Sequence, residues 1–468
     1  MVKYPGKTFQ LSIEKLGFGG EGIAHLEDLV IFVQGGIPGQ RVEVVITKQK
    51  SNFLEARILK VLEKSPQEIL PACAHFGICG GCKWQNLTYE QQVKYKEEQV
   101  QECLEHLGKI STTGILKPIQ SSPQIWAYRN KVEFSFGYAS MEVKRDENGH
   151  KIYQDENPNL GFHPQNHWET TTPIQKCQLI SDTANQVKQI VADYCLNISP
   201  AVYNPYNHRG IWRVLQIREN LVGEIMLNLV VNQELEPNFW PGLLELLPPA
   251  VISVYQTLHQ GLNDQWQSGT SMVIKGQSVI YEEILGLKFA ISPLSFFQTN
   301  SRGASVLYQM VKDIAQQIQA QNILDLYCGT GTIGQILAGK NGYASIIGID
   351  TVASAIKDAY QNSKLNGLNN VEFIVGAAEK VLPELKKNFR HNFDLIIVDP
   401  PRSGLHPQAL QSLLDFSTKH LIYISCNPST LARDLQLLSH QYRIQSIQAM
   451  DMFPHTSHIE TVCHLSRA

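Results

Sequence analysis

The sequence is poor in charged residues and lacks a long apolar run. Charged side chains make up 18% of its 468 residues, against about 25% in an average soluble protein, which excludes the highly charged disordered class. No stretch of about 18 uncharged apolar residues occurs, so we expect no membrane-spanning helix and no membrane partner. The N-terminus also lacks the apolar core of a signal peptide, which favours a cytoplasmic location with reduced thiols.

The sequence has no excess of positive charge either. Its formal net charge is -3, whereas a protein that binds nucleic acid by electrostatics alone is strongly basic. Any contact with a nucleic acid therefore depends on local patches. Lys48, Lys50 and Arg57 form one candidate patch for tracking phosphates, and simple solvation of surface cations is the alternative.

Length and local pattern predict three domains. Residues 1–62 contain short β-branched runs and glycine-rich turns, which are typical of a small barrel. Residues 63–290 form a central domain with a helix at 89–107 and a polar loop or hairpin tip at 141–158. Residues 291–468 alternate strands and helices, which predicts a doubly wound α/β sheet. Its expected strands are residues 322–326, 345–349, 371–375, 394–398 and 420–425.

A glycine loop follows the first strand of this sheet. Gly329, Gly331 and Gly334 form a G-x-G-x-x-G pattern between a strand and a helix, and Asp350 ends the next strand. Glycines allow a tight turn and close approach of a ligand, while the acid can accept hydrogen bonds from ribose hydroxyls. These features predict an adenosine-containing ligand, with a bare tight turn as the alternative. NAD and S-adenosylmethionine both satisfy the pattern.

Reactive side chains follow two later strands. Asp399 precedes two prolines after the fourth strand, an element common in base-modifying methyltransferases, and Cys426 directly follows the fifth strand. Near the C-terminus, Glu460 lies close to His455 and His458. A cysteine in a turn after a buried strand is placed like a nucleophile, and a carboxylate near a buried site suits proton abstraction. A buried core cysteine and a solvated loop are the alternatives.

A thiol, a carboxylate and a methyl donor together suit one reaction. Carbon 5 of uracil is a poor nucleophile until a thiolate adds to carbon 6 and turns the ring into an enolate. Carbon 5 can then take a methyl group, after which a base removes its proton and elimination frees the cysteine. Because the thiolate is the reactive form, we expect the surroundings of Cys426 to lower its pKa.

The other cysteines fall into two groups. Cys73, Cys79 and Cys82 are clustered, and Cys177 follows at a distance. Four such thiols can bind zinc or an iron–sulfur cluster, and unrelated core cysteines are the alternative. The remaining cysteines are interpreted as small core residues: Cys103, Cys195, Cys463 and, beneath the glycine loop, Cys328.

Several of these segments together resemble the signature set of the RNA 5-methyluridine methyltransferases. The set comprises SFFQTN at 295–300, LDLYCGTGT at 324–332, DPPRSG at 399–404, YISCNPSTLARD at 423–434 and DMFPHTSHIE at 451–460. The N-terminal barrel, with its glycine-rich stretch at 16–25 and its turn at 37–39, is similar to the TRAM domain, an OB-like RNA-binding module. The resemblance implies a Rossmann-like methyltransferase domain, an N-terminal OB-like β-barrel and a central α+β iron–sulfur domain.

The resemblance also implies roles for matching residues. Cys426 matches the family nucleophile, and Glu460 matches the base. Asp399 matches a position that faces both the uracil and the cofactor pocket. The S-adenosylmethionine site is expected to comprise Gln298, Tyr327, Asp350, Asp399 and, from the glycine loop, Gly329. Members that act on ribosomal RNA hold a [4Fe-4S] cluster, which implies a structural cluster on Cys73, Cys79, Cys82 and Cys177.

The implied activity is methylation of carbon 5 of a uridine in RNA by a class I enzyme. The barrel and the cysteine cluster favour 23S rRNA, and tRNA is the alternative because some archaeal tRNA enzymes resemble this architecture. Candidate RNA contacts are Tyr128, Arg129 and Lys131, at the start of a strand in which apolar and polar residues alternate, while Trp212 fits either a contact or the core. We expect a monomer. Two other hypotheses are a non-catalytic RNA-binding iron–sulfur protein and a nicotinamide-dependent oxidoreductase.

Overall fold

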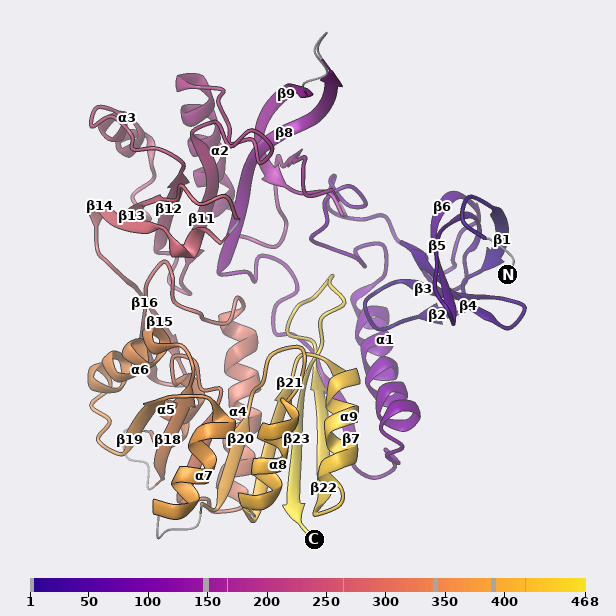
Figure 1. Ribbon diagram of the computed structural model, residues 1–468, viewed down its shortest axis with the longest axis vertical. Coiled ribbons are helices and arrows are strands. Elements are labelled where there is room, and N and C mark those ends of the chain that lie inside the picture. Colours follow the sequence, from indigo (N-terminus) through magenta and orange to yellow (C-terminus); the bar gives the residue numbers. More distant parts are fainter. Residues whose placement is uncertain are drawn as a thin grey trace.

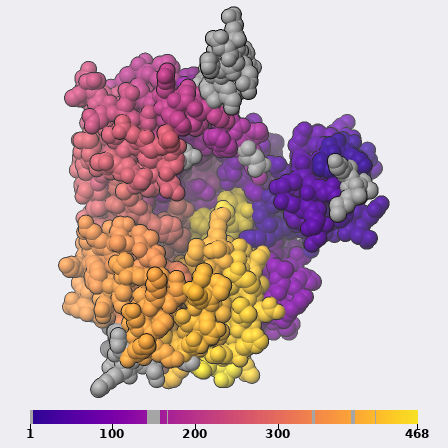
Figure 2. Space-filling view, viewed as in Figure 1, coloured from indigo at the N-terminus to yellow at the C-terminus, as the bar shows by residue number. Residues whose placement is uncertain are grey.

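The structure is a computed structural model with three bodies (Figure 1). It describes residues 4–145, 151–165, 167–263, 265–339, 344–388, 393–416 and 418–468, without the side chains of 141–145, 151–156 and 388. The N-terminal body projects from the side of the other two (Figure 2). Within the described residues, no helix combines the length and the apolar character that crossing a membrane requires.

The N-terminal domain is a six-stranded sheet with the order β1-β5-β6-β4-β3-β2. Its strands are β1 (Thr8–Ser12), β2 (Lys15–Leu16), β3 (Gly22–Leu26), β4 (Leu29–Gln34), β5 (Arg41–Gln49) and β6 (Phe53–Glu63). Alternate β-branched side chains, among them Ile31, Val42 and Val44, form its core. The short strands are confirmed. Closure into a barrel is not, because in the part of the chain that is described no hydrogen-bonded ladder joins β1 to β2.

The central domain is a seven-stranded sheet with the order β10-β9-β8-β11-β12-β13-β14. Its strands are β8 (Lys131–Arg145), β9 (Lys151–Phe162), β10 (Thr172–Pro173), β11 (Trp212–Glu219), β12 (Ile225–Val231), β13 (Val251–Leu258) and β14 (Thr270–Gly276). The helices α2 (Asp182–Ile198) and α3 (Phe239–Leu246) share one apolar core with the sheet. As the alternation predicts, Val132, Phe134 and Phe136 point into that core.

Of the two interpretations of residues 141–158, the hairpin is confirmed and the loop is wrong for most of the segment. β8 continues to Arg145 and pairs with β9 from Lys151 onward, so these residues form the two arms of a long hairpin. Backbone ladder bonds hold such arms together whatever the polarity of the side chains, which is why polarity alone misleads here. Residues 146–150 lie outside the described part of the chain.

The C-terminal domain is built on an eight-stranded sheet with the order β19-β18-β17-β20-β21-β23-β22-β7. Its strands are β17 (Asn322–Leu326), β18 (Ser345–Asp350), β19 (Val371–Val375), β20 (Leu395–Val398), β21 (His420–Ser425), β22 (Tyr442–Met450), β23 (Glu460–Arg467) and β7 (Leu116–Gln120). Strands β17 to β21 are parallel, and β23 runs antiparallel to β21. The five strands expected from the sequence are confirmed.

Helices and one hairpin complete this domain. The helices are α4 (Ser301–Gln317), α5 (Thr332–Ala338), α6 (Ala353–Leu365), α7 (Ala378–Asn388), α8 (Pro407–Phe416) and α9 (Pro428–Leu438). The hairpin of β15 (Ile280–Ile284) and β16 (Leu287–Ile291) leads from the central domain into α4. Its apolar side chains pack into one of the apolar cores of the C-terminal sheet, together with residues of α4 and β17.

A segment from the first third of the chain packs on the C-terminal sheet. The predicted helix at 89–107 is confirmed as α1 (Tyr89–Glu102), which continues into the π-helical turn η1 (Cys103–Leu107). The strand β7 pairs in parallel with β22, and Leu104 lies in a core shared with the C-terminal sheet. Figure 1 shows α1 lying beside α9, between the N-terminal and C-terminal bodies.

Candidate active site

Cys426 lies in the turn between β21 and α9, at the carboxyl edge of the parallel strands, and is half-buried. Asn427 directly after it caps α9, because its Oδ1 accepts hydrogen bonds from the backbone N–H groups of Ser429 (3.0 Å) and Thr430 (3.4 Å). Its Nδ2 donates to the carbonyl of Arg402 at 3.1 Å. The cap and this bond fix the turn that presents the thiol.

The neighbouring strand supplies a carboxylate and a cation. Asp399 follows β20, which runs parallel to β21, so the turns after both strands lie at one edge of the sheet. Arg402 lies in the same turn, and its Nη2 donates to Nδ1 of His458 at 3.1 Å. His458 is neutral at physiological pH, since burial and then the charge of Arg402 lower its pKa to about 4. This arrangement places one guanidinium beside the thiol.

Glu460 reaches the same edge from the C-terminal strand. It is the first residue of β23, and the next residue, Thr461, lies opposite Ser425 in the antiparallel ladder with β21. Glu460 is 7% exposed. The ladder therefore places Glu460 beside Cys426, although other elements separate the two residues in the sequence.

The electrostatics of the site favour protonated forms. Burial raises the pKa of Cys426 to about 11, and Glu460 and Asp399 add to the rise while Arg402 opposes it. Burial and Asp399 raise the pKa of Glu460 to about 8, and burial raises that of Asp399 to about 7. The prediction that the surroundings lower the pKa of Cys426 is therefore wrong for this structure. Two nearby carboxylates outweigh the single cation.

The glycine loop is shaped by backbone conformations that few residues adopt. Tyr327 has a φ of 62° and Gly331 a φ of 70°, and a Cβ on Gly331 would lie 2.5 Å from the ring of Phe373. Oδ2 of Asp350 accepts a hydrogen bond from the N–H of Gly329 at 2.9 Å. The loop after β17 and the acid after β18 are thus held together, as the sequence pattern predicts for an adenosine site.

Two residues of the site were not predicted from the sequence. Asp325 lies within β17 and is 1% exposed; its Oδ2 accepts from the N–H of Gly334 at 3.0 Å, while its Oδ1 has no hydrogen-bond partner among the described residues. Burial raises its pKa to about 7. Tyr308 of α4 is buried beside the carboxylates of Asp399 and Glu460, which add to the rise that burial causes in its pKa. Asp325 could have been found from the sequence, because an acid inside an apolar strand is unusual. Tyr308 could not, because its pattern is that of an ordinary aromatic core residue.

Gln298 connects the site to the central domain. It precedes α4, and its side chain forms a hydrogen bond with Tyr308 that favours the ionised tyrosine. Its backbone carbonyl accepts from Nδ2 of Asn130 at 2.8 Å, and the same Nδ2 lies 2.7 Å from Oγ of Ser301. The five residues predicted for the cofactor thus lie on the loops after β16, β17 and β20 and at the last position of β18, all in one domain.

A separate cavity of about 640 Å³ brings the four predicted metal ligands together. Cys73, Cys79, Cys82 and Cys177 all line it, with Arg129 beside them. Burial raises the pKa of Cys82 to about 12, and the charges of Cys177 and Cys79 add to that rise, so the thiols lie close enough to influence one another. Among the described residues, however, no three Cys, His, Asp or Glu side chains are grouped tightly enough to hold one metal ion.

Two of the other predicted contacts lie in the interior, and a third is already paired. Tyr128 is 5% exposed and its hydroxyl donates to the carbonyl of Pro454 at 3.0 Å, so its ring cannot stack on a base. Lys131 forms an ion pair with Glu133 at 2.6 Å. Trp212 belongs to the central core. The interpretation as core residues is confirmed for Cys103, Cys195 and Cys463, which are buried, and for Cys328, which packs beside Phe373 under the loop.

The arrangement resembles known enzymes along its whole length. A model of the TRAM domain matches residues 2–59, and a model described as tRNA (Uracil-5-)-methyltransferase matches residues 270–468. The structure also resembles that of the Pyrococcus abyssi tRNA (uracil-54, C5)-methyltransferase in complex with S-adenosyl-L-homocysteine. That match has a TM-score of 0.72 and 25% identity, and it covers 98% of this chain and 100% of that one. Fold and site define a class I S-adenosylmethionine-dependent methyltransferase.

Curated relatives identify the family. An RNA methyltransferase of Clostridium tetani is 37% identical over 476 residues, which cover 100% of this chain and 99% of that protein. Another, of Bacteroides thetaiotaomicron, is 36% identical over 448 residues, covering 95% and 98% of the two chains. The chain belongs to the tRNA (uracil-5-)-methyltransferase family, with an N-terminal TRAM domain, and is an RNA methyltransferase.

Proposed function

We propose that this enzyme methylates carbon 5 of a uridine in 23S rRNA through a covalent adduct with Cys426. The observation that carries this proposal is the ladder between β21 and β23, which sets a thiol and a buried carboxylate side by side at the edge of the sheet where the glycine loop also lies. The chemistry needs both groups within reach of one uracil ring. A cytoplasmic location, where thiols stay reduced, fits a catalytic cysteine.

The proposed reaction uses the two groups in sequence. The thiol proton leaves to solvent, and the thiolate of Cys426 forms a bond to carbon 6, which moves an electron pair onto carbon 5. Carbon 5 then bonds the methyl group of S-adenosylmethionine, whose carbon–sulfur bond breaks to leave neutral S-adenosylhomocysteine. The carboxylate of Glu460 takes the proton from carbon 5, and the bond between carbon 6 and sulfur breaks to restore the thiolate.

The residues around the glycine loop suit the methyl donor. Asp350 would accept hydrogen bonds from the ribose hydroxyls. Its carboxylate oxygens retain lone pairs beyond the backbone bonds that they already accept. Oδ1 of Asp325, which lacks a hydrogen-bond partner among the described residues, and the half-buried Asp399 would supply negative charge to a cationic sulfonium in their ionised forms. Tyr327, Gly329 and Gln298 would complete the walls of this site.

We propose that the four thiols of the second cavity hold a [4Fe-4S] cluster. The cluster's cysteines each bind a different iron, so they are spaced more widely than the ligands of one ion, which agrees with thiols that share a cavity without forming a single-ion site. The cluster would supply a crosslink between the segment near residue 80 and that near residue 177 rather than electrons. Cys177 is prepared for this by Asn185, which hydrogen-bonds both its N–H and its carbonyl.

The RNA would enter over the TRAM domain and the exposed edge of the site. Lys50 and Arg57 lie on the surface of that domain, while Lys48 already pairs with Glu55 at 3.6 Å. Phe296, two residues before Gln298, is 72% exposed and offers a ring on which a base removed from its stack could rest.

A tRNA uridine is the second candidate substrate. It is favoured by the structural match to an enzyme named for uridine 54 of tRNA, which spans nearly the whole of both chains. Mass-spectrometric mapping of 5-methyluridine in ribosomal and transfer RNA from a strain that lacks this protein tests both. Loss at a large-subunit rRNA site supports the proposal, loss in tRNA replaces the substrate, and no loss in either RNA contradicts it.

A further inference from the structure

The loop that precedes Glu460 is fixed by contacts with residues from the first third of the chain. Residues 451–459 connect β22 to β23, and the ladder between these strands ends with Met450 opposite Glu460. The loop thus starts next to the strand partner of the proposed base and ends at the base itself. Its backbone is not regular, and His455 in its middle has a φ of 66°. A loop of this kind keeps one conformation only if its surroundings impose it.

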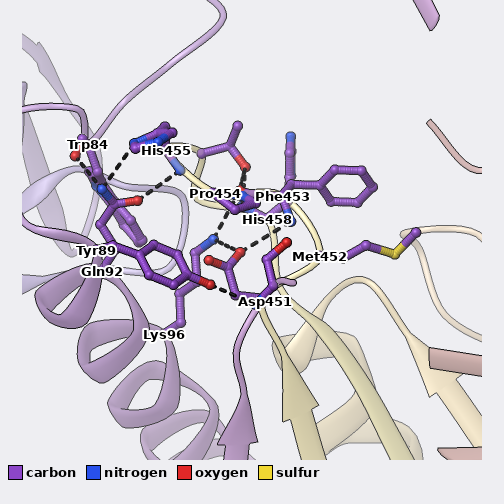
Figure 3. Close-up of polar contacts among 12 residues, drawn as sticks. Trp84, Tyr89, Gln92, Lys96, Asp451, Met452, Phe453, Pro454, His455 and His458 are labelled. Atoms are coloured by element: carbon purple, nitrogen blue, oxygen red, sulfur yellow. Dashed lines mark hydrogen bonds and ion pairs between the residues drawn. The ribbon is translucent and has the colours of Figure 1, made fainter. Parts of the chain in front are cut away.

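A buried ion pair fixes the first part of the loop. Nζ of Lys96, on α1, lies 2.6 Å from Oδ1 of Asp451, and both side chains are 0% exposed. The same Nζ donates to the carbonyl of Phe453 at 3.1 Å, and Oδ1 of Asp451 also accepts from the N–H of Phe453. Figure 3 shows the lysine reaching from its helix into the bend of the loop. Two charges withdrawn from water in this way are held in one geometry, since breaking the pair leaves a buried charge unpaired.

A glutamine one turn earlier on α1 fixes the middle of the loop. Oε1 of Gln92 accepts from the N–H of His455 at 2.8 Å, and its Nε2 lies 3.1 Å from Nδ1 of the same histidine (Figure 3). Gln92 is 0% exposed. The indole of Trp126 stacks on the His455 ring at 3.7 Å between centroids. Burial and then the charge of Lys96 lower the pKa of His455 to about 4, so the imidazole that contacts Gln92 is neutral at physiological pH.

Residues 83 and 84, which follow the N-terminal domain in the chain, contact the same loop and join it to a turn of that domain. The backbone N–H groups of Lys83 and Trp84 donate to the carbonyl of His455 at 2.8 and 3.2 Å. The Lys83 ammonium in turn donates to the carbonyl of Gly19 at 2.6 Å. A Cβ on Gly20 would lie 3.1 Å from Cβ of Ser457. The loop therefore lies between α1 and a glycine turn of the TRAM domain.

We propose that Lys96 and Gln92 are positioning residues for Glu460. They act through the loop 451–459, hold the carboxylate over the turn that carries Cys426, and touch neither substrate. The inference rests on the proposed role of Glu460 as the base. The thiol lies in the turn between β21 and α9, which is linked to the loop through Arg402 and His458. Among the described residues, neither Lys96 nor Gln92 bonds to that turn. Loosening the loop should therefore impair removal of the carbon 5 proton more than addition of the thiolate. Misplacement of a catalytic group by about 1 Å costs on the order of 100-fold in rate.

The test compares two RNA substrates in a denaturing gel assay. Gln92→Leu removes the hydrogen bonds to His455 without leaving a buried charge. Lys96→Met combined with Asp451→Asn removes both charges of the ion pair. With uridine RNA and donor, both variants should accumulate the methylated covalent adduct, with turnover lowered about 10- to 100-fold. RNA with 5-fluorouridine has no carbon 5 proton to lose, so it should trap wild type and variants to the same extent. Lys94→Met is the matched control, because Lys94 is exposed on the same helix and its one ion pair among the described residues is with Glu98.

Two outcomes would overturn the inference. One is a variant that turns over as fast as wild type. The other is a variant whose trapping of 5-fluorouridine RNA falls in step with turnover while its circular dichroism and donor affinity stay intact, because thiolate addition would then depend equally on the loop. Failure of the wild-type enzyme to trap 5-fluorouridine RNA is a different result, which refutes the proposed covalent mechanism itself.

Discussion

Thr461 lies directly opposite Ser425 in the ladder between β23 and β21. This register makes the residue before one partner, Glu460, a neighbour of the residue after the other, Cys426. A shift of the ladder by one residue would turn the carboxylate to the opposite face of the sheet, because side chains alternate along a strand. The backbone of two antiparallel strands thus sets the distance between the proposed nucleophile and the proposed base.

Replacing either of these groups should stop the reaction at a different stage. Cys426→Ala is expected to abolish methylation, because no enolate forms, while donor binding stays near that of wild type. Glu460→Gln should leave thiolate addition and methyl transfer possible and should accumulate a protein–RNA adduct, with turnover lowered by about 100-fold or more. The adduct is seen as a slowly migrating band on a denaturing gel. Full turnover by the alanine variant would rule out covalent catalysis, and free RNA alone with the glutamine variant would rule out Glu460 as the base.

The rate of adduct breakdown should rise with pH. Glu460 must be ionised to take a proton, and burial together with Asp399 raises its pKa to about 8. The carboxylate is therefore mostly protonated below about pH 7 and mostly ionised above about pH 9, so the rate increases through this interval. Single-turnover measurements of the decay of preformed adduct isolate this step from thiolate formation. A rate that is flat over the interval would show that Glu460 does not limit the step.

Donor affinity should depend on pH more strongly than product affinity. Burial raises the pKa of Asp399 and of Asp325 to about 7, and a nearby sulfonium cation favours their ionised forms. Binding of S-adenosylmethionine then releases a proton and tightens by up to about tenfold per pH unit below that pKa. S-adenosylhomocysteine is uncharged at sulfur and should show a weaker trend. Calorimetric titrations of both ligands between about pH 6 and 8 make the comparison, and identical pH trends would contradict the proposed charge contact.

The glycine turn of the TRAM domain offers a test of its contact with the loop 451–459. Gly20 has a φ of 96°, and a Cβ there would lie 2.7 Å from Cδ of Lys83 as well as close to Ser457. Gly35 has a φ of 74° but open space around it. Gly20→Ala and Gly35→Ala share the backbone cost of about 1 to 2 kcal/mol, while only the first disturbs the contact. We expect only the Gly20 variant to slow methylation, and equal rates at matched stability would show that the contact is irrelevant to catalysis.

The four cavity thiols predict a measurable iron content. Protein purified without oxygen should contain about four iron atoms and as many acid-labile sulfides per chain, with the broad visible absorbance of such clusters. Cys177→Ser should lower iron and sulfide and destabilise the central domain. Cys195→Ala is the control, because Cys195 is a buried core thiol away from the cavity. Stoichiometric zinc without sulfide in the wild-type protein would replace the cluster with a metal ion.

The sequence predicted the C-terminal strands and the glycine loop because these features are local. A buried parallel strand requires a continuous apolar run, as at 322–326 and 420–425, and a tight turn beside a nucleotide requires glycine, as at Gly331. At 141–158 the sequence left a loop and a hairpin tip both open, because a backbone ladder leaves no apolar signature in polar arms. The interior position of Tyr128 escaped because local alternation does not reveal what packs above a strand.

By itself the sequence determined which side chains we propose for the chemistry, because Cys426 and Asp399 follow strands, Glu460 begins one and Asp350 ends one. Only the tertiary structure decided how their charges interact. The raised pKa of Cys426 depends on burial and on carboxylates distant in the chain, and no periodicity encodes such distances. The same is true of α1, whose local pattern predicts a helix but not its partner. Its Lys96 pairs with Asp451, and the neighbouring β7 pairs with β22 at the edge of the sheet. Both contacts join segments more than 300 residues apart in the sequence, and local pattern does not encode such partners.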